Sequence, residues 1–115
     1  MQQQQLEKYG LTKPGAWEDY PFGPEPLVLK TGSKMFALLT EESVSLKCDP
    51  VIAESLREQH KAITPGYHLN KKHWNSIALD GSLSLEELQA MMDHSYELVF
   101  RSLTKAEREK ISEAK

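Results

Sequence analysis

Two short apolar runs on either side of a two-residue turn signal constrain the fold more than any other feature of the sequence. In "PLVLKTGSKMFALL" the dipeptide Gly32-Ser33 stands between the runs. A two-residue connection joins antiparallel strands, because parallel strands need a crossover of a dozen residues or more. Glycine supplies the positive φ that a type II′ hairpin turn requires at its first central position. The sequence therefore predicts a tight hairpin here.

Three further strands are predicted from alternation and apolar runs. Residues 43–48, "SVSLKC", alternate between an apolar and a polar face, which is typical of a strand with one side in water. Cys48 falls on the apolar side, so we interpret it as a core residue. Residues 63–70 and 73–79 are predicted to be two more strands, joined near residues 70–72.

Two helices carry clear N-terminal signals. Asp49 is a good N-cap, and Pro50 takes the first helical position, where a missing N–H costs nothing. Ser84 and Glu87 have the spacing of a capping box at the start of a long helix over residues 85–103. Helical spacing predicts which side chains these two helices bury, namely Ile52, Ala53 and Leu56 in the first and Leu85, Leu88, Met92, Ser95 and Val99 in the second.

These elements predict one α+β domain over residues 1–115. A short helix over residues 2–9 comes first, and the element order is α-β-β-β-α-β-β-α. The expected architecture is a two-layer sandwich, with a mainly antiparallel five-stranded sheet and helices on one face. We expect the other sheet face to be largely exposed to water. The chain after Thr104 either starts a further turn or frays.

The segment "PGAWEDYPFGPEP", residues 14–26, is predicted to be an irregular loop because six of its 13 residues are Pro or Gly. It also holds Trp17, Tyr20 and Phe22. We expect these aromatic rings to pack onto the body of the protein. Contact with a ligand is the alternative.

Composition excludes several classes of protein. The 115 residues are 39% hydrophobic and 27% charged, with a net charge of -3, which is typical of a globular chain. A single cysteine allows neither an intrachain disulfide nor a cysteine-based zinc site. The apolar runs are far shorter than a membrane span, and the first ten residues lack a signal-peptide pattern. We expect a cytoplasmic monomer without a cofactor, a resident metal or a membrane partner.

The basic residues gather in one stretch of this acidic chain. Residues 59–79 contain no Asp or Glu but hold three lysines and three histidines. Seven basic side chains are candidates for phosphate contact. They lie at the predicted hairpin tip, beside the first hairpin turn and on the water-facing side of the third predicted strand. They are Lys71, Lys72, His73 and the preceding His68, then Lys30 and Lys34, and finally Lys47. The alternative is an ordinary solvated turn, since lysine is common on exposed sheet edges.

Trp74 directly follows this basic tip. As a stacking platform for bases it would face outward beside the lysines. As a buried residue it would fill space next to Ser76 and Ala78, which share its face of an extended strand. We predict burial on the helix side, so that truncation would destabilise the fold.

The chain resembles the MmcQ/YjbR family of small bacterial proteins. The resemblance rests on an ordered set of motifs covering nearly the whole chain, namely "PGA" (14–16), "PFG" (21–23), "GSKMFA" (32–37), "TPGYHLNKKHW" (64–74) and "LSLEELQAMMDHSYELV" (83–99). It implies a CyaY-like α+β fold and DNA binding through a "double wing" of hairpin tips. The sequence itself shows no helix-turn-helix signature.

The predicted function is therefore weak, largely sequence-independent DNA binding by basic hairpins, without enzymatic activity. No Gly-x-Ser-x-Gly motif, His-Glu-x-x-His motif or phosphate-binding glycine loop is present. One alternative is a protein-interaction module that uses the exposed sheet face or the aromatic loop. Another is a CyaY-like metal-binding protein, although the first helix carries only Glu7 where such carriers have a dense acidic ridge.

Overall fold

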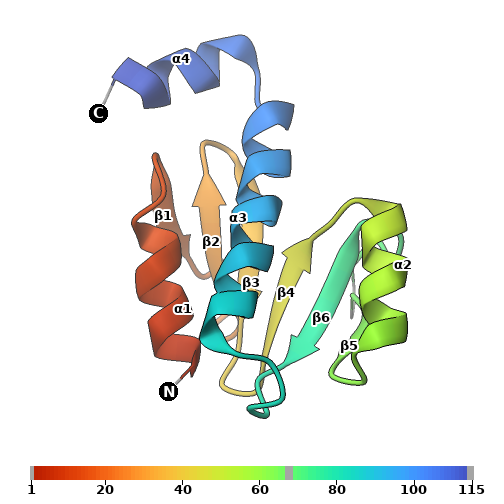
Figure 1. The fold of residues 1–115 in the computed structure, drawn as a ribbon. Helices are drawn as coiled ribbons and strands as arrows, with labels where there is room; N and C mark the ends of the chain where they lie inside the picture. The colour runs from red at the N-terminus through yellow and green to blue at the C-terminus, as the bar shows by residue number, and fades with distance from the viewer. Residues whose placement is uncertain (1, 67–68, 114–115) are drawn as a thin grey trace.

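The computed structural model describes residues 2–66 and 69–113 as an α+β fold (Figure 1). Four helices and six strands follow one another along the chain. They are α1 (Gln2–Leu11), β1 (Ala16–Asp19), β2 (Leu27–Thr31), β3 (Lys34–Leu39), β4 (Ser43–Lys47), α2 (Pro50–Gln59), β5 (Ile63–Pro65), β6 (Trp74–Ala78), α3 (Leu85–Ser102) and α4 (Lys105–Glu113). In the described part of the chain, every helix is too short or too polar to cross a lipid bilayer.

The sheet is antiparallel, with strand order β1-β2-β3-β4-β6-β5. The predicted tight hairpin is confirmed, because Thr31 pairs with Lys34 across the two-residue turn. Gly32 has a φ of 59°, the left-handed conformation for which glycine was expected. The predicted strand over residues 63–70 is too long, since β5 ends at Pro65.

The prediction of five strands is wrong, because part of the aromatic loop forms a sixth. Ala16–Asp19 pairs with β2 along its whole length, from Ala16 opposite Thr31 to Asp19 opposite Val28. The prolines and glycines that favoured a loop lie on either side of this four-residue strand and leave its backbone free to pair. Pairing with a distant strand therefore overrides the local signal.

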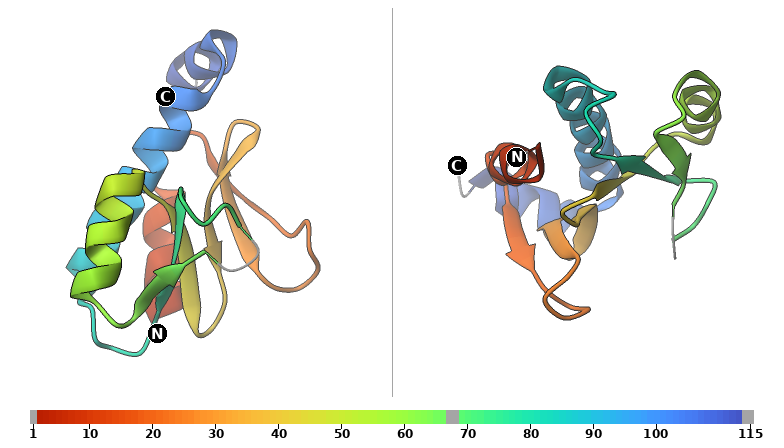
Figure 2. Two further views of the ribbon diagram at one scale, coloured as in Figure 1. Left: turned by 90° about the vertical axis from the view of Figure 1, so that its right-hand side faces the viewer. Right: turned by 90° about the horizontal axis from the view of Figure 1, so that it is seen from below.

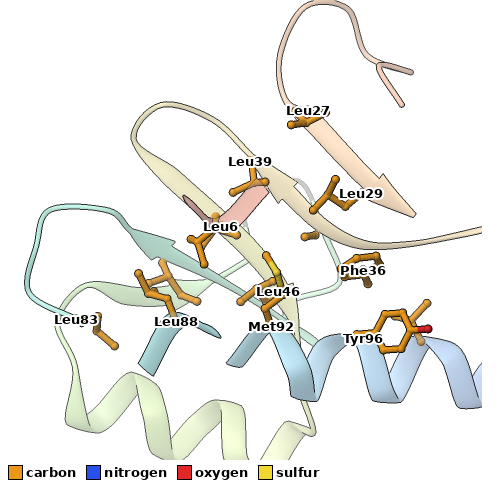
Figure 3. Close-up of a cluster of buried hydrophobic side chains, with 14 of the residues drawn as sticks. Leu6, Leu27, Leu29, Phe36, Leu39, Leu46, Leu83, Leu88, Met92 and Tyr96 are labelled. Carbon is orange, nitrogen blue, oxygen red and sulfur yellow. The ribbon is translucent and has the colours of Figure 1, made fainter. Parts of the chain in front are cut away.

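Helices α1, α2 and α3 lie on one side of the sheet (Figure 2, right). The capping predictions are confirmed: the Asp49 carboxylate accepts from two N–H groups of α2, and Ser84 and Glu87 form a reciprocal box on α3. The main core lies between α1, α3 and the sheet (Figure 3). Ser95 is buried there and is satisfied, because its hydroxyl donates to the Phe36 carbonyl at 2.6 Å and accepts from the Lys47 N–H.

The predicted buried stripe of α2 is wrong in part. Ala53 is fully buried and Leu56 is half-buried, but Ile52 is exposed beside the still more exposed Val51. The physical reason is the place of α2, which packs at the β5 end of the sheet, away from α3 (Figure 1). Only a narrow face of α2 therefore contacts the rest of the protein.

A fourth helix, α4, turns away from α3 and passes over the β2–β3 turn. A methyl group on Gly32 would come within 3.2 Å of Leu103, and the Ser33 N–H donates to the Glu107 carboxylate at 3.2 Å. This hydrogen bond and those from Thr104 lower the pKa of Glu107. The chain after Thr104 thus continues as a helix that covers the first hairpin tip.

The sheet face opposite the helices, called the outer face below, is less exposed than predicted. Val28, Ser45 and Trp74 are buried although they alternate with residues of the main core. The loop after β1 and residues 69–73 before β6 project on this side of the sheet (Figure 2, right). They shield part of the face that a simple two-layer sandwich would leave in water.

Candidate nucleic-acid interface

The basic turn, residues 70–73, is organised by the side chain and carbonyl of Asn70. The Asn70 Oδ1 atom accepts from the N–H groups of Lys72 and His73, at 3.0 and 3.2 Å. Its carbonyl accepts from His73 and Trp74. Asparagine is common in turns because its side chain binds the backbone two residues on. The side chains of Lys71, Lys72 and His73 are left exposed to solvent.

Arg57 of α2 ties this turn to the body of the protein. Its Nε atom donates to Oδ1 of the buried Asn75 at 2.7 Å. Its Nη2 atom donates to the Lys71 carbonyl and lies 3.4 Å from the Trp74 carbonyl. A planar guanidinium with donors in a fixed fork suits such a multiple contact. The arginine therefore sets where the basic turn lies relative to α2.

A shallow depression of about 530 Å³ lies between the basic turn and α2. Four of its lining side chains are basic, and one is acidic. The lining residues are Arg57, Lys71, Lys72 and His73, together with Glu54 and Pro50. Cationic side chains around a surface hollow favour binding of an anion such as a phosphate group, although Glu54 opposes it.

Lys47 lies next to this cluster in the sheet. It pairs with Trp74 in the β4–β6 register, and the His73 carbonyl accepts from the Cys48 N–H at 2.7 Å. Its side chain is half-buried. Lys47 therefore belongs to the same end of the sheet as the basic turn, although it does not line the depression beside α2.

Both lysines of the first hairpin have protein partners, and at the basic turn Lys71 donates to the Gly66 carbonyl at 3.2 Å. Lys30 forms an ion pair with Asp19 at 2.8 Å and lies 5.2 Å from the centre of the Trp17 ring. The ion pair lowers the pKa of Asp19. Lys34 donates to the carbonyl and hydroxyl of Ser102, at 3.0 and 3.2 Å, at the C-terminal end of α3. Cations are stabilised at this end of a helix.

The structure thus brings Lys71, Lys72 and His73 together and separates them from Lys30 and Lys34. The predicted His68 lies outside the described residues. Arg57 was not among the predicted site residues. It lies two positions before the acid-free stretch, on a helix. The signal that points to it is its place in the last turn of α2, close in sequence to the basic region.

The predicted burial of Trp74 is confirmed, but its place differs from the prediction. Trp74 shares the outer face with Ser76, and the adjacent Ile77 points into the main core. A Cβ on Gly66 would lie 2.7 Å from the Trp74 Cβ, so the backbone at Gly66 passes directly against this side chain. Glycine is required there by this close approach. Trp74 therefore packs beneath the basic turn as a buried structural residue.

Cys48 and His94 both contribute to the structure of the fold. Cys48 is buried, and burial raises the pKa of its thiol, which disfavours the nucleophilic thiolate. His94 accepts from the Asp49 N–H through Nε2 at 3.2 Å and so supports the start of α2. Over residues 2–66 and 69–113, no three His, Cys, Asp or Glu side chains converge as metal ligands would.

Comparison with known proteins identifies relatives along nearly the whole chain. It is 35% identical to the protein YjbR of Escherichia coli K12 over 108 residues, which cover 90% of this chain and 92% of that protein. It is 30% identical to YyaQ of Bacillus subtilis over 106 residues, covering 80% and 88% of the two chains. The crystal structure of Deinococcus radiodurans DR2400, a DUF419 domain, matches with a TM-score of 0.87 and 39% identity, covering 95% of this chain and 86% of that one. The YjbR family model matches residues 11–98, and the chain therefore belongs to the YjbR family.

Proposed function

We propose that this protein binds DNA weakly and with little dependence on sequence, through the basic turn. The observation that carries the proposal is the grouping of exposed Lys71, Lys72 and His73 with Arg57 around one depression. Lysine and arginine contacts to phosphates position a protein on nucleic acid without reading bases. His73 adds a charge when it is protonated.

Weak binding follows from the charge of the whole chain. The net charge is -3, and Glu54 lines the depression itself. Release of counterions from DNA grows with the number of phosphates contacted, and only a few basic side chains are available here. The binding is therefore expected at low salt and lost as salt rises.

The proposal relies on one hairpin rather than on two wings. Lys30 and Lys34 already have partners in Asp19 and Ser102, and α4 covers the turn between them. To contact phosphates, Lys30 and Lys34 would first have to give up these contacts. Lys47 is placed to contribute a phosphate contact next to the basic turn.

A salt titration tests the proposal. With three or four phosphate contacts, log affinity should fall against log salt with a slope of about -3, since each contact contributes about -0.9. The double substitution Lys71→Ala with Lys72→Ala should make this slope about two units shallower and leave the melting temperature nearly unchanged. Lys105→Ala with Lys110→Ala is the matched control, because both are exposed lysines on α4. Equal slopes for the two double variants would rule out the basic turn as the DNA site.

A protein-interaction module is the second candidate, and exposed apolar residues on α2 favour it. Val51 is 77% exposed, and Ile52 beside it is also exposed. Neighbouring exposed aliphatic side chains are a common feature of protein interfaces. If Val51→Ser with Ile52→Ser abolished capture of a specific protein from cell extract and left DNA binding intact, this function would stand beside the first.

A further inference from the structure

A groove of about 620 Å³ runs across the outer face of the sheet. Its floor is a row of paired residues on three adjacent strands: Leu38 pairs with Ser45, and Ser45 pairs with Ser76. One wall comes from the loop after β1, with Phe22 and Pro26, and the other from Leu69, directly before the basic turn. Both segments project away from the helices (Figure 2, right). The groove is therefore separate from the depression beside α2, and the residues 69–73 lie between the two.

The groove is hollow because small residues lie between larger ones. Ser45 and Ser76 fill little space, and their hydroxyl oxygens lie 2.9 Å apart. Three strands at the usual spacing span roughly 10 Å, which gives the floor the width of a flat heteroaromatic ring with its substituents. A volume in this range is typical of ligand sites. The hollow follows from the sequence, since larger residues at positions 45 and 76 would fill it.

The chemistry of the groove suits a ligand with apolar faces and polar edges. Phe22 is 62% exposed, so its ring is available for stacking. Leu69, Leu38 and Pro26 add apolar surface, and the Ser45 hydroxyl, which is hydrogen-bonded to Ser76, has a second lone pair that can accept from a polar group on a ring edge. A nucleobase has this combination of faces and edges, and stacking on aromatic rings is how proteins bind unpaired bases.

We propose that this groove receives an unpaired base of a single-stranded nucleic acid whose phosphates contact the basic turn. The inference rests on the proposed function and narrows its substrate class. The charge of the neighbouring turn supports it: the segment that forms one wall with Leu69 continues into Lys71 and Lys72, so an anionic backbone has cations next to the groove. A base inside a duplex is paired and stacked, and it cannot enter such a groove without leaving its partner.

Fluorescence anisotropy with three labelled DNAs tests the inference at one low salt concentration. They are a thymidine oligonucleotide of about ten residues, which is within the site sizes of single-strand binders, the same backbone without bases, and a hairpin duplex. The strand with bases should bind roughly 5- to 150-fold more tightly than the abasic strand, because one stacked base contributes about 1–3 kcal/mol. It should also bind more tightly than the duplex.

Phe22→Ala should reduce the affinity for the strand with bases to that for the abasic strand. The matched control is Tyr20→Ala, which removes another exposed aromatic ring of the same loop that does not line the groove. Circular dichroism should show an unchanged fold for both, since both rings are exposed. Equal affinity of wild type for strands with and without bases, or no effect of Phe22→Ala, would overturn the inference.

The outcomes separate this inference from the proposed function. If Lys71→Ala with Lys72→Ala flattens the salt dependence while bases and Phe22 have no effect, the phosphate site stands and the groove assignment fails. If no DNA binds even at low salt, both fail. If thymidine monophosphate competes at the same concentration as the strand, the groove binds free nucleotides and the assignment to a strand is wrong.

Discussion

The turn between β2 and β3 and the basic turn before β6 look alike in sequence and differ in the folded protein. Both are short polar turns with lysines close by, and both lie at the same end of the sheet (Figure 1). At the first turn Lys34 holds the end of α3, and Glu107 of α4 accepts from Ser33. At the second, Lys71, Lys72 and His73 remain exposed, and Arg57 fixes the backbone beneath them.

The two turns differ in how far distant elements of the fold use their polar groups. Residues about 70 positions further along the chain lie beside the first turn. They accept hydrogen bonds from the Ser33 N–H and the Lys34 ammonium group. The second turn is held mainly through its backbone carbonyls, which accept from Arg57, while Lys71 donates to the Gly66 carbonyl at 3.2 Å and its side chain stays exposed. The backbone of the basic turn is therefore held in place while its lysine and histidine side chains stay exposed to solvent.

The two tryptophans give the largest expected contrast between these regions. Trp74 is 9% exposed beneath the basic turn, whereas Trp17 is 43% exposed beside the first hairpin. Trp74→Ala should lower the free energy of unfolding by ~3–5 kcal/mol, as truncation of buried aromatic residues does. Trp17→Ala should cost about 1 kcal/mol, mainly through its hydrogen bond to the Gly32 carbonyl. Urea denaturation measures both, and similar losses for the two variants would contradict the described burial.

A smaller effect is expected from removing Arg57. In Arg57→Ala the Oδ1 atom of buried Asn75 and the Lys71 carbonyl lose their donor, and an unsatisfied buried group costs about 1–3 kcal/mol. Arg101→Ala is the control, because Arg101 is exposed on α3 and its side chain forms an exposed ion pair with Glu97. Amide hydrogen exchange should speed up at residues 71–74 in the first variant alone. Unchanged exchange there would mean that the turn is held by Asn70 without the arginine.

The smallest effect is expected from the lysines of the first hairpin. Lys30→Ala with Lys34→Ala removes as much charge as the Lys71 and Lys72 double variant, yet it should leave the salt slope of DNA binding within about half a unit of wild type, less than one phosphate contact. The reason is that Asp19 and Ser102 already hold these ammonium groups. A slope that becomes shallower by about two units would show that both hairpins bind DNA as a pair of wings.

Local signals in the sequence predicted a large part of this fold. Gly32-Ser33 fixed one register, and Asp49, Ser84 and Glu87 marked the starts of two helices within a residue or two. The alternation of Val44 and Leu46 with serines placed β4 correctly. In each of these cases the residues that determine the structure are neighbours in the chain, so the physics is visible in a short window.

The missed features depend on distant partners. Strand β1 exists because β2 offers a free edge, and the proline-rich flanks of β1 hide this from local reasoning. The covering of the first turn by α4, and the contact of Arg57 with Lys71 and Asn75, join elements that no local pattern links. The grouping of Lys71, Lys72 and His73 could be predicted since they are consecutive, whereas the engagement of Lys30 and Lys34 could not.

The two outermost strands have a further consequence for how copies of this protein meet one another. β1 has four residues and carries Glu18 and Asp19, and β5 has three and ends in Pro65, which has no N–H to offer a neighbouring strand. Short, charged or proline-terminated edges are poor templates for adding another strand. Sheet growth from one molecule to the next, the first step towards fibrils, is therefore disfavoured at both ends of the sheet.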